Sequence, residues 1–200
     1  LPGFAEGAWW VQDAAASLPA RLFGDVAGKR AYDLCAAPGG KTAQLAAAGG
    51  RITAVEKSPA RLARLSDNLK RLGLSAAAIA ADATSWQPPH AADAVLLDAP
   101  CSATGTIRRH PDIAWTKRAA DMAKLTELQD RLLRHALTMV APGGVLVYAV
   151  CSLQREEGPA RIEQLLRDGA AAERLPITAA ECGGLPVAIT SAGDLRTLPC

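Results

Sequence analysis

Short apolar runs alternate with helix-forming stretches along most of the chain, and this alternation limits the possible folds more than any other feature. The predicted strands are residues 31–36, 52–56, 77–82, 94–99 and 144–150. The predicted helices are residues 41–48, 58–72, 117–140 and 159–168. Strands that are separated by helices form right-handed βαβ units and a mostly parallel sheet. Because the strands are apolar throughout, we expect a doubly wound α/β fold with helices on both faces of the sheet.

Both ends of the chain are less regular. Residues 8–23 predict an opening amphipathic helix, and a turn leads from it to the first strand, so that residues 1–30 precede the core. From residue 170 onward the pattern weakens, and GGLPVAIT and GDLRTLPC predict one or two further strands. A length of 200 residues, half of them apolar, suits one well-filled core, so we expect a single domain over residues 1–200.

Composition argues against several classes of protein. With 22 basic and 20 acidic residues, the chain lacks the strong positive charge of a self-sufficient nucleic-acid binder. The five cysteines form no C-x-x-C pair and the three histidines are scattered, so we expect no metal site. The chain shows neither a signal-peptide pattern nor an apolar run of about 18 residues. We therefore expect no membrane partner, no obligate protein partner and a reduced, cytoplasmic location.

A glycine-rich loop follows the first predicted strand, in the sequence DLCAAPGGKT. A strand, a tight turn and a helix start in this order let a ligand approach backbone N–H groups, so we expect a nucleotide-like ligand there. Glu56 closes the second strand, where it can accept hydrogen bonds from ribose hydroxyls, and Asp82 closes the third, where it can meet an adenine amino group. The sequence leaves open that the glycines only make a turn and that the acidic residues only cap helices.

A nucleoside triphosphate site is the competing interpretation of this loop. The pattern G-x-x-x-x-G-K-[ST] requires glycine at position 35, where this chain has Cys35. Pro38 also interrupts the series of N–H donors that a phosphate cradle needs. Binding of a nucleoside without a triphosphate therefore fits better.

Two cysteines follow neighbouring strands of the predicted sheet. Cys101 comes after the fourth strand and Cys151 after the fifth, at the carboxyl edge that holds the predicted ligand. Adjacent strands lie about 5 Å apart, so both thiols could flank one substrate ring. A cysteine is more often a small buried apolar residue, which we expect of Cys182 and Cys200. Cys35 is expected to pack or to belong to the loop.

Such a thiol pair suits methylation of cytosine at C5. That carbon is too poor a nucleophile to attack a methyl sulfonium, but a thiolate that adds to C6 makes C5 enamine-like. Asp98 is the nearest candidate to hydrogen-bond N3 during this addition, and a second group near C5 would help the product to leave. The base must be unstacked to enter, which favours RNA loops over duplexes. Either thiol could be the nucleophile in this chemistry.

The sequence resembles the bacterial small-subunit (16S) ribosomal RNA cytosine-C5 methyltransferases of the Sun type, within the NOL1/NOP2/Sun family. The stretches that carry the resemblance cover residues 1 to about 158 in order: LPGFAEGAWWVQDAAA, DLCAAPGGKT, VEKS, DAPCSATGTIRRHPDIAW and LVYAVCSLQREEG. It implies a class I, Rossmann-like methyltransferase domain that uses S-adenosyl-L-methionine. It also implies that Cys151 is the nucleophile and that Cys101 assists release. The implied cofactor-binding residues are Cys35, Ala36, Ala37, Pro38, Gly39, Gly40, Lys41, Glu56, Asp82 and Asp98.

The chain departs from the family pattern in a few places. Val150 stands where Thr is usual, Ala149 where Ser is common and Ala103 where many members have Gly, and none of these changes removes a reacting group. A region similar to the NusB antitermination factor, which usually precedes this domain, and a final Asp-Gly-Phe-Phe strand are expected to be missing. A transfer-RNA or DNA cytosine methyltransferase, and a non-catalytic RNA-binding module that keeps the fold, are the alternative functions.

One basic cluster follows the Cys101 loop. Its candidate RNA-binding residues are Arg108, Arg109, Lys117 and Arg118. A group of charges is as often a solvated surface as a binding site. Its position after a predicted catalytic residue favours contact with RNA phosphates.

Overall fold

The computed structural model describes residues 1–116, 118–185 and 188–198. They divide into two compact units. The first unit contains residues 1–98 and 135–148, and the second contains residues 99–134 and those from 149 onward. Whether residues 1–200 act as one catalytic domain stays a prediction.

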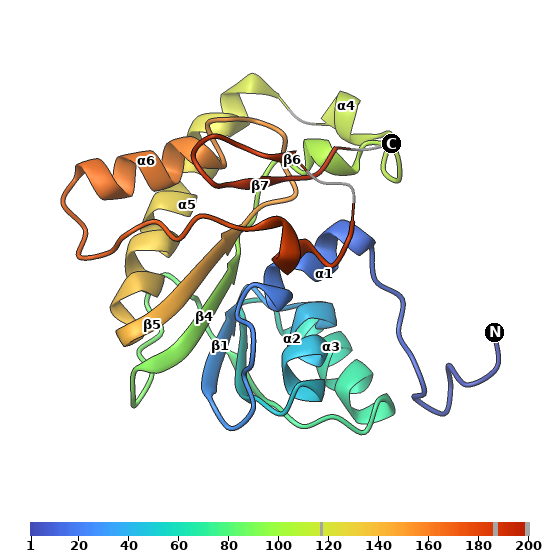
Figure 1. The fold of residues 1–200 in the computed structure, drawn as a ribbon. Coiled ribbons are helices and arrows are strands. Elements are labelled where there is room, and N and C mark those ends of the chain that lie inside the picture. The colour runs from blue at the N-terminus through green and yellow to red at the C-terminus, as the bar shows by residue number, and fades with distance from the viewer. Residues whose placement is uncertain (117, 186–187, 199–200) are drawn as a thin grey trace. The chain divides into compact units, whose positions relative to one another are not determined.

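Within the described residues the main sheet has five strands, which are β1 (Arg30–Leu34), β2 (Arg51–Glu56), β3 (Ala77–Ala80), β4 (Ala92–Asp98) and β5 (Val140–Ala149). Their order is β3-β2-β1-β4-β5. Figure 1 labels three of them, β1, β4 and β5. Strand β1 pairs in parallel with β2 on one side and β4 on the other, and β2 pairs in parallel with β3. The chain therefore reverses its direction of travel across the sheet at β1, which confirms the predicted doubly wound arrangement with its switch point between β1 and β4.

Three helices belong to the first unit: α1 (Ala14–Arg21), α2 (Gly40–Ala47) and α3 (Pro59–Arg71). Helix α3 begins where expected, because the Ser58 side chain accepts a hydrogen bond from the Arg61 N–H and Pro59 occupies the first turn. Its Leu65 and Leu69 pack with Ala54 of β2 in a core of small side chains. Alanine at the helix contacts lets the backbones approach closely, in agreement with the low aromatic content.

The opening helix is shorter than the predicted span of residues 8–23. It begins at Ala14, because the Asp13 carboxylate caps it by accepting a hydrogen bond from the Ala15 N–H at 2.9 Å. The preceding segment is held by Arg71 instead. The Arg71 guanidinium donates to the carbonyls of Phe4 and Trp9 and lies 3.9 Å from the centroid of the Phe4 ring. The helical periodicity of residues 8–13 therefore does not decide their conformation, because the Asp13 cap and the Arg71 contacts do.

Strand β3 also differs from the prediction. It ends at Ala80, so Asp82 lies beyond the strand rather than closing it. Most of its side chains are exposed, whereas continuous apolar strands were expected to be covered. The reason is its position, because β3 is the edge strand of the described sheet and pairs only with β2.

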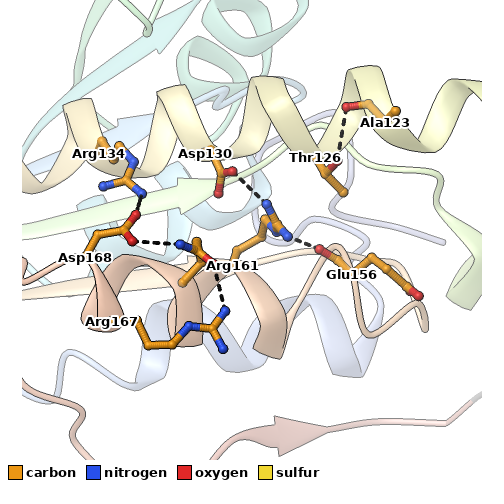
Figure 2. Close-up of polar contacts among 9 residues, drawn as sticks. Ala123, Thr126, Asp130, Arg134, Glu156, Arg161, Arg167 and Asp168 are labelled. Carbon is orange, nitrogen blue, oxygen red and sulfur yellow. Dashed lines mark hydrogen bonds and ion pairs between the residues drawn. The ribbon is translucent and has the colours of Figure 1, made fainter.

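The second unit contains α4 (Ile113–Thr116), most of α5 (Ala119–Thr138) and α6 (Pro159–Arg167). Figure 2 shows the polar contacts between α5 and α6. Arg161 pairs with Asp130 at 2.6 Å and also donates to the Glu156 carbonyl at 2.7 Å, while Arg134 pairs with Asp168. These contacts fasten α6, and the loop that precedes it, to α5.

The irregular tail holds a short 3-10 helix (Ala179–Cys182) and two antiparallel strands, β6 (Ala188–Ile189) and β7 (Leu195–Arg196). This confirms the predicted short strands. Cys182 is buried, as expected for a packing residue, and Cys200 lies outside the described residues. In the part of the chain that the structure describes, no helix is both long and apolar enough to cross a membrane.

Candidate active site

The glycine-rich loop connects β1 directly to α2. Gly39 has a φ of 100°, and a Cβ atom at this position would lie 2.9 Å from Leu65 Cγ, so only glycine fits without displacement. Gly39 is also the N-cap residue of α2, and no side chain caps that end of the helix. The first N–H groups of α2 are therefore open to an external acceptor.

Asp33 lies in β1 just before this loop. Its side chain is fully buried, and Oδ2 accepts a hydrogen bond from the Thr42 hydroxyl at 2.6 Å. Among the described residues, Oδ1 has no hydrogen-bond partner. Burial raises the pKa of Asp33 to about 7, although the Thr42 hydrogen bond opposes this shift. A buried carboxylate oxygen without a donor is costly, so this atom is available to a ligand or water.

Glu56 closes β2 and is 3% exposed. Its Oε1 accepts a hydrogen bond from the Ser58 N–H at 2.9 Å. Its Oε2 lies 3.4 Å from Arg61 Nη1 but accepts no hydrogen bond from the described residues. One oxygen of this carboxylate therefore stabilises the turn, and the other could accept a hydrogen bond from a hydroxyl group.

Lys41 and Asp98 form an ion pair across the carboxyl edge of the sheet. The Lys41 Nζ atom lies 2.7 Å from Asp98 Oδ2, and the Lys41 side chain is only 14% exposed. Cys35 lies near these charges. Burial, followed by the charges of Glu56, Asp98 and Asp33, raises the pKa of Cys35 to about 12. The thiolate form of Cys35 is therefore disfavoured.

Asp82 has a local structural role. Its Oδ1 accepts hydrogen bonds from the N–H and the hydroxyl of Thr84, and its Oδ2 accepts one from Lys57 at 2.8 Å. The hydrogen bonds from Lys57 and Thr84 hold the pKa of Asp82 well below its usual range. These contacts fit the alternative in which Asp82 acts as a cap, and its contact with a ligand stays a prediction.

The two candidate catalytic thiols, Cys101 and Cys151, lie close together in the second unit. The sulfur atoms of Cys101 and Cys151 are 3.4 Å apart. Cys151 is exposed, whereas Cys101 is half-buried. The hydrogen bond with Cys151, and then burial, raise the pKa of Cys101 far above its usual value. This disfavours the thiolate form of Cys101, and either sulfur can be the donor of the hydrogen bond between them.

A buried network behind the thiols was not found from the sequence. The Glu157 carboxylate is fully buried and accepts hydrogen bonds from the Ser102 N–H, the Ser102 hydroxyl and the Gln129 amide. Ser102 Oγ is also 3.0 Å from Ser152 Oγ. Ser102 and Ser152 are the residues that directly follow the two cysteines. Glu157 thus holds together the two loops that carry the thiols.

A second set of contacts joins the same loops through the backbone. The Gly105 N–H donates to the Cys151 carbonyl at 3.0 Å, and a Cβ atom on Gly105 would lie 2.9 Å from that oxygen. The Thr104 hydroxyl accepts a hydrogen bond from the Leu153 N–H at 3.0 Å. The one signal in the sequence that could have indicated this network is Gln129, a polar side chain within an otherwise apolar helix face.

Three of the four candidate RNA-binding residues lie in the described part of the chain. Arg108, Arg109 and Arg118 are all exposed in the second unit. Lys117 lies outside the described residues.

Among the residues that are described, no group of three or more His, Cys, Asp and Glu side chains could hold a metal ion.

Comparison with known proteins gives one consistent family. Residues 23–200 match the family described as 16S rRNA methyltransferase RsmB/F. The chain is 46% identical over 172 residues to ribosomal RNA small subunit methyltransferase B from Salmonella arizonae, which is 84% of this chain and 40% of that protein. The chain therefore spans about two fifths of the length of this relative.

Two solved structures from Pyrococcus horikoshii are also similar. One is NSun6 with SFG, at 30% identity and a TM-score of 0.79, over 89% of this chain and 47% of that one. The other is a methyltransferase homolog, at 33% identity and a TM-score of 0.75, over 89% of this chain and 57% of that one. The similarity confirms the predicted class I, Rossmann-like methyltransferase fold.

Proposed function

The chain belongs to the RsmB/F family of 16S rRNA methyltransferases, and on that premise we propose that it transfers a methyl group from S-adenosylmethionine to C5 of an unstacked cytosine in small-subunit ribosomal RNA. The observation that carries the C5 chemistry is the 3.4 Å approach of the Cys101 and Cys151 sulfur atoms. A methyltransferase whose target is already a good nucleophile needs no thiolate, and a binding module has no use for two adjacent thiols.

The residues of the first unit fit the cofactor. Glu56 Oε2 and Asp33 Oδ1 are buried acceptors that receive no hydrogen bond from the described residues, and a ligand with hydroxyl and ammonium groups has donors for them. Glu56 would hold the ribose hydroxyls of S-adenosylmethionine. The loop from Cys35 to Lys41 would lie against the rest of the cofactor, and Asp82 and Asp98 would lie at the margins of its site. The structure of NSun6 was determined with SFG. When bound, S-adenosylmethionine supplies an electrophilic methyl group.

The two thiols divide the covalent chemistry between them. Cys151 is the exposed member of the pair, and its thiolate adds to C6 of the cytosine. A new S–C6 bond forms, and the displaced electron pair makes C5 nucleophilic. C5 takes up the methyl group, with S-adenosylhomocysteine as the leaving group. The C5 proton then passes to water, its electron pair restores the C5=C6 double bond, and the S–C6 bond breaks to return the Cys151 thiolate. Cys101 keeps its proton, and its S–H group hydrogen-bonds to the departing Cys151 sulfur, which eases release.

Asp98 is proposed to hydrogen-bond cytosine N3 while the thiolate adds. In the structure its Oδ2 atom lies 2.7 Å from Lys41 Nζ. Along the chain, only Ala99 and Pro100 separate Asp98 from Cys101.

Arg108, Arg109, Lys117 and Arg118 are proposed to contact RNA phosphates. Because the substrate is ribosomal RNA, we also infer that the protein works in the cytoplasm.

The experiment that tests the proposal is methyl transfer from labelled S-adenosylmethionine to protein-free small-subunit ribosomal RNA. We expect label at C5 of cytosine with the unchanged chain and none with Cys151→Ser. Cys182→Ser, which alters a buried cysteine far along the chain, is the matched control and should retain activity. Label on the exocyclic N4 atom, or undiminished transfer by Cys151→Ser, would refute the thiolate mechanism. Transfer RNA as substrate tests the alternative target.

Two further variants separate the roles of the other residues. Cys101→Ala should accumulate a covalent RNA–protein adduct that survives denaturing electrophoresis, because release is slowed more than attack. Asp98→Asn should slow adduct formation itself. If Cys101→Ala gives no adduct while turnover falls, its proposed role in release is wrong.

A further inference from the structure

Trp115 is an aromatic side chain that the mechanism does not use and that the fold does not bury. It lies in α4 and is 88% exposed, compared with 42% for Phe4, the other strongly exposed aromatic among the described residues. An indole ring has a large apolar surface, which is costly to leave in water. Isolated exposed apolar residues are common, so the surroundings of Trp115 decide whether it has a function.

The segment that carries Trp115 is exposed but well ordered by its backbone. Residues 107–116 are all exposed except Ile113, which is buried and anchors the segment. The His110 N–H donates to the Thr106 carbonyl at 2.9 Å, and the Thr116 N–H donates to the Asp112 carbonyl at the same distance. Trp115 is therefore presented on a fixed turn and not on a loose loop.

This turn is joined to the catalytic loops of the same unit. The 3-10 helix Thr104–Thr106 leads into it, and Gly105 in that helix donates to the carbonyl of Cys151. Whatever binds the turn is consequently held at a set position relative to the nucleophile.

The charge of the turn indicates what it binds. Arg108, Arg109 and Arg118 are exposed within ten residues of Trp115, and the acidic residues of the same stretch are Asp112 and Asp121. The Asp121 carboxylate accepts a hydrogen bond from the Arg118 N–H, so it is partly used within the turn. Exposed cations around a flat aromatic ring are typical of surfaces that bind single-stranded nucleic acid.

We propose that Trp115 is a stacking platform for an unpaired base of the RNA that flanks the target cytosine, with Arg108, Arg109 and Arg118 holding the adjoining phosphates. This inference rests on the proposed function and extends it, because it requires an extruded second base as well as an extruded target. A duplex offers no free base face, so it should gain nothing from Trp115.

The test compares Trp115→Ala with Trp115→Phe, which retains an aromatic face, and with Leu175→Ala, a change at another exposed apolar residue of the same unit. Affinity for a fluorescently labelled single-stranded RNA and for its duplex is measured by anisotropy. Stacking on one aromatic ring contributes about 1–3 kcal/mol per base, which is roughly a 5- to 150-fold change in affinity. We expect a loss in this range for Trp115→Ala on single strands, a small loss for Trp115→Phe and none for Leu175→Ala.

Turnover separates this inference from the proposed function. If the unchanged chain methylates RNA, Trp115→Ala should raise the apparent KM for RNA and leave kcat within about twofold, with unchanged affinity for S-adenosylmethionine. The binding assay decides the inference even if no methylation is found. Equal affinity of Trp115→Ala and the unchanged chain for single strands would overturn it, as would an equal loss on single strands and duplex. If Trp115→Ala weakened binding to a protein segment and not to RNA, the surface would be assigned to a protein partner instead.

Discussion

The buried Glu157 carboxylate should be essential for the stability of the second unit, because its replacement leaves buried hydrogen-bond donors without an acceptor. Glu157→Leu removes the acceptor for the Ser102 N–H and for one N–H of Gln129. It also removes the acceptor for the hydroxyl groups of Ser102 and Ser152. These two hydroxyls can bond to each other instead, because their oxygen atoms are 3.0 Å apart. The other two donors have no such alternative, since the remaining Gln129 hydrogen bond goes to the Pro100 carbonyl.

The expected magnitude follows from these two orphaned donors. A buried donor without an acceptor costs about 1–3 kcal/mol, so Glu157→Leu should lower the free energy of unfolding by about 2–6 kcal/mol. The residue is 0% exposed, so water does not restore the lost bonds without opening the loop. A domain has about 5–15 kcal/mol in total, so the unit would be close to unfolding. Glu157→Gln keeps one acceptor oxygen and should cost about 1 kcal/mol.

Urea denaturation followed by far-UV circular dichroism measures both variants. Glu163→Leu is the control, because Glu163 forms an exposed ion pair with Arg155 whose loss should cost less than about 1 kcal/mol. If Glu157→Leu is destabilised no more than this control, the argument from unsatisfied buried donors is wrong for this site.

The same residue predicts a pH dependence. Burial raises the pKa of Glu157, but hydrogen bonds from Ser102, Ser152 and Gln129 outweigh burial, and the pKa lies below its ordinary value of 4.5. A lowered folded-state pKa contributes stability that is present above the unfolded-state pKa and is lost as the pH falls. Stability should therefore fall as the pH drops below about 4.5, and this fall should be smaller in Glu157→Gln. Parallel pH profiles for the two proteins would contradict the assignment.

Three other predictions concern the first unit and the thiols. Gly39→Ala places a Cβ atom 2.9 Å from Leu65 Cγ at a positive φ, so calorimetry should show at least about tenfold weaker binding of S-adenosylmethionine, and unchanged affinity would refute the fit. Because burial raises the pKa of Asp33 to about 7, the ionised form is disfavoured in the fold; stability should fall as the pH rises from about 4 through 7, and Asp33→Asn should remove this slope. Iodoacetamide at pH 8 should modify exposed Cys151 and spare Cys35, whose pKa is raised to about 12; mass mapping that finds Cys35 modified first would contradict this.

The strand order and the glycine-rich loop between β1 and α2 could be predicted because their signals are local. A β-strand, a Gly-rich turn and a helix start are adjacent in the chain, and the rule for parallel sheets then places β4 beside β1. The prediction of the opening helix failed where a local signal competed with a tertiary one. Residues 8–13 have helical periodicity, but the Asp13 cap and the hydrogen bonds from Arg71 hold them in another conformation.

The Asp82 interpretation shows the limit of motif spacing. An acidic residue after a strand can face a ligand or close its own turn, and both produce the same sequence pattern. Here Thr84 and Lys57 donate to the Asp82 carboxylate from within about 3 Å, and a contact of Asp82 with the cofactor stays a prediction. Glu56 differs because one of its oxygens lacks a hydrogen bond from any described residue.

The sequence by itself determined the α/β fold, the site of the glycine-rich loop and the two cysteines that follow neighbouring strands, because each is encoded by residues close together in the chain. Only the tertiary structure decided that the two sulfur atoms lie 3.4 Å apart, and that a buried carboxylate from residue 157 holds the residue after Cys101 in place. Contacts between residues 50 or more positions apart depend on how loops pack, and hydrogen bonding in a buried environment selects their partners through geometry that no local pattern records.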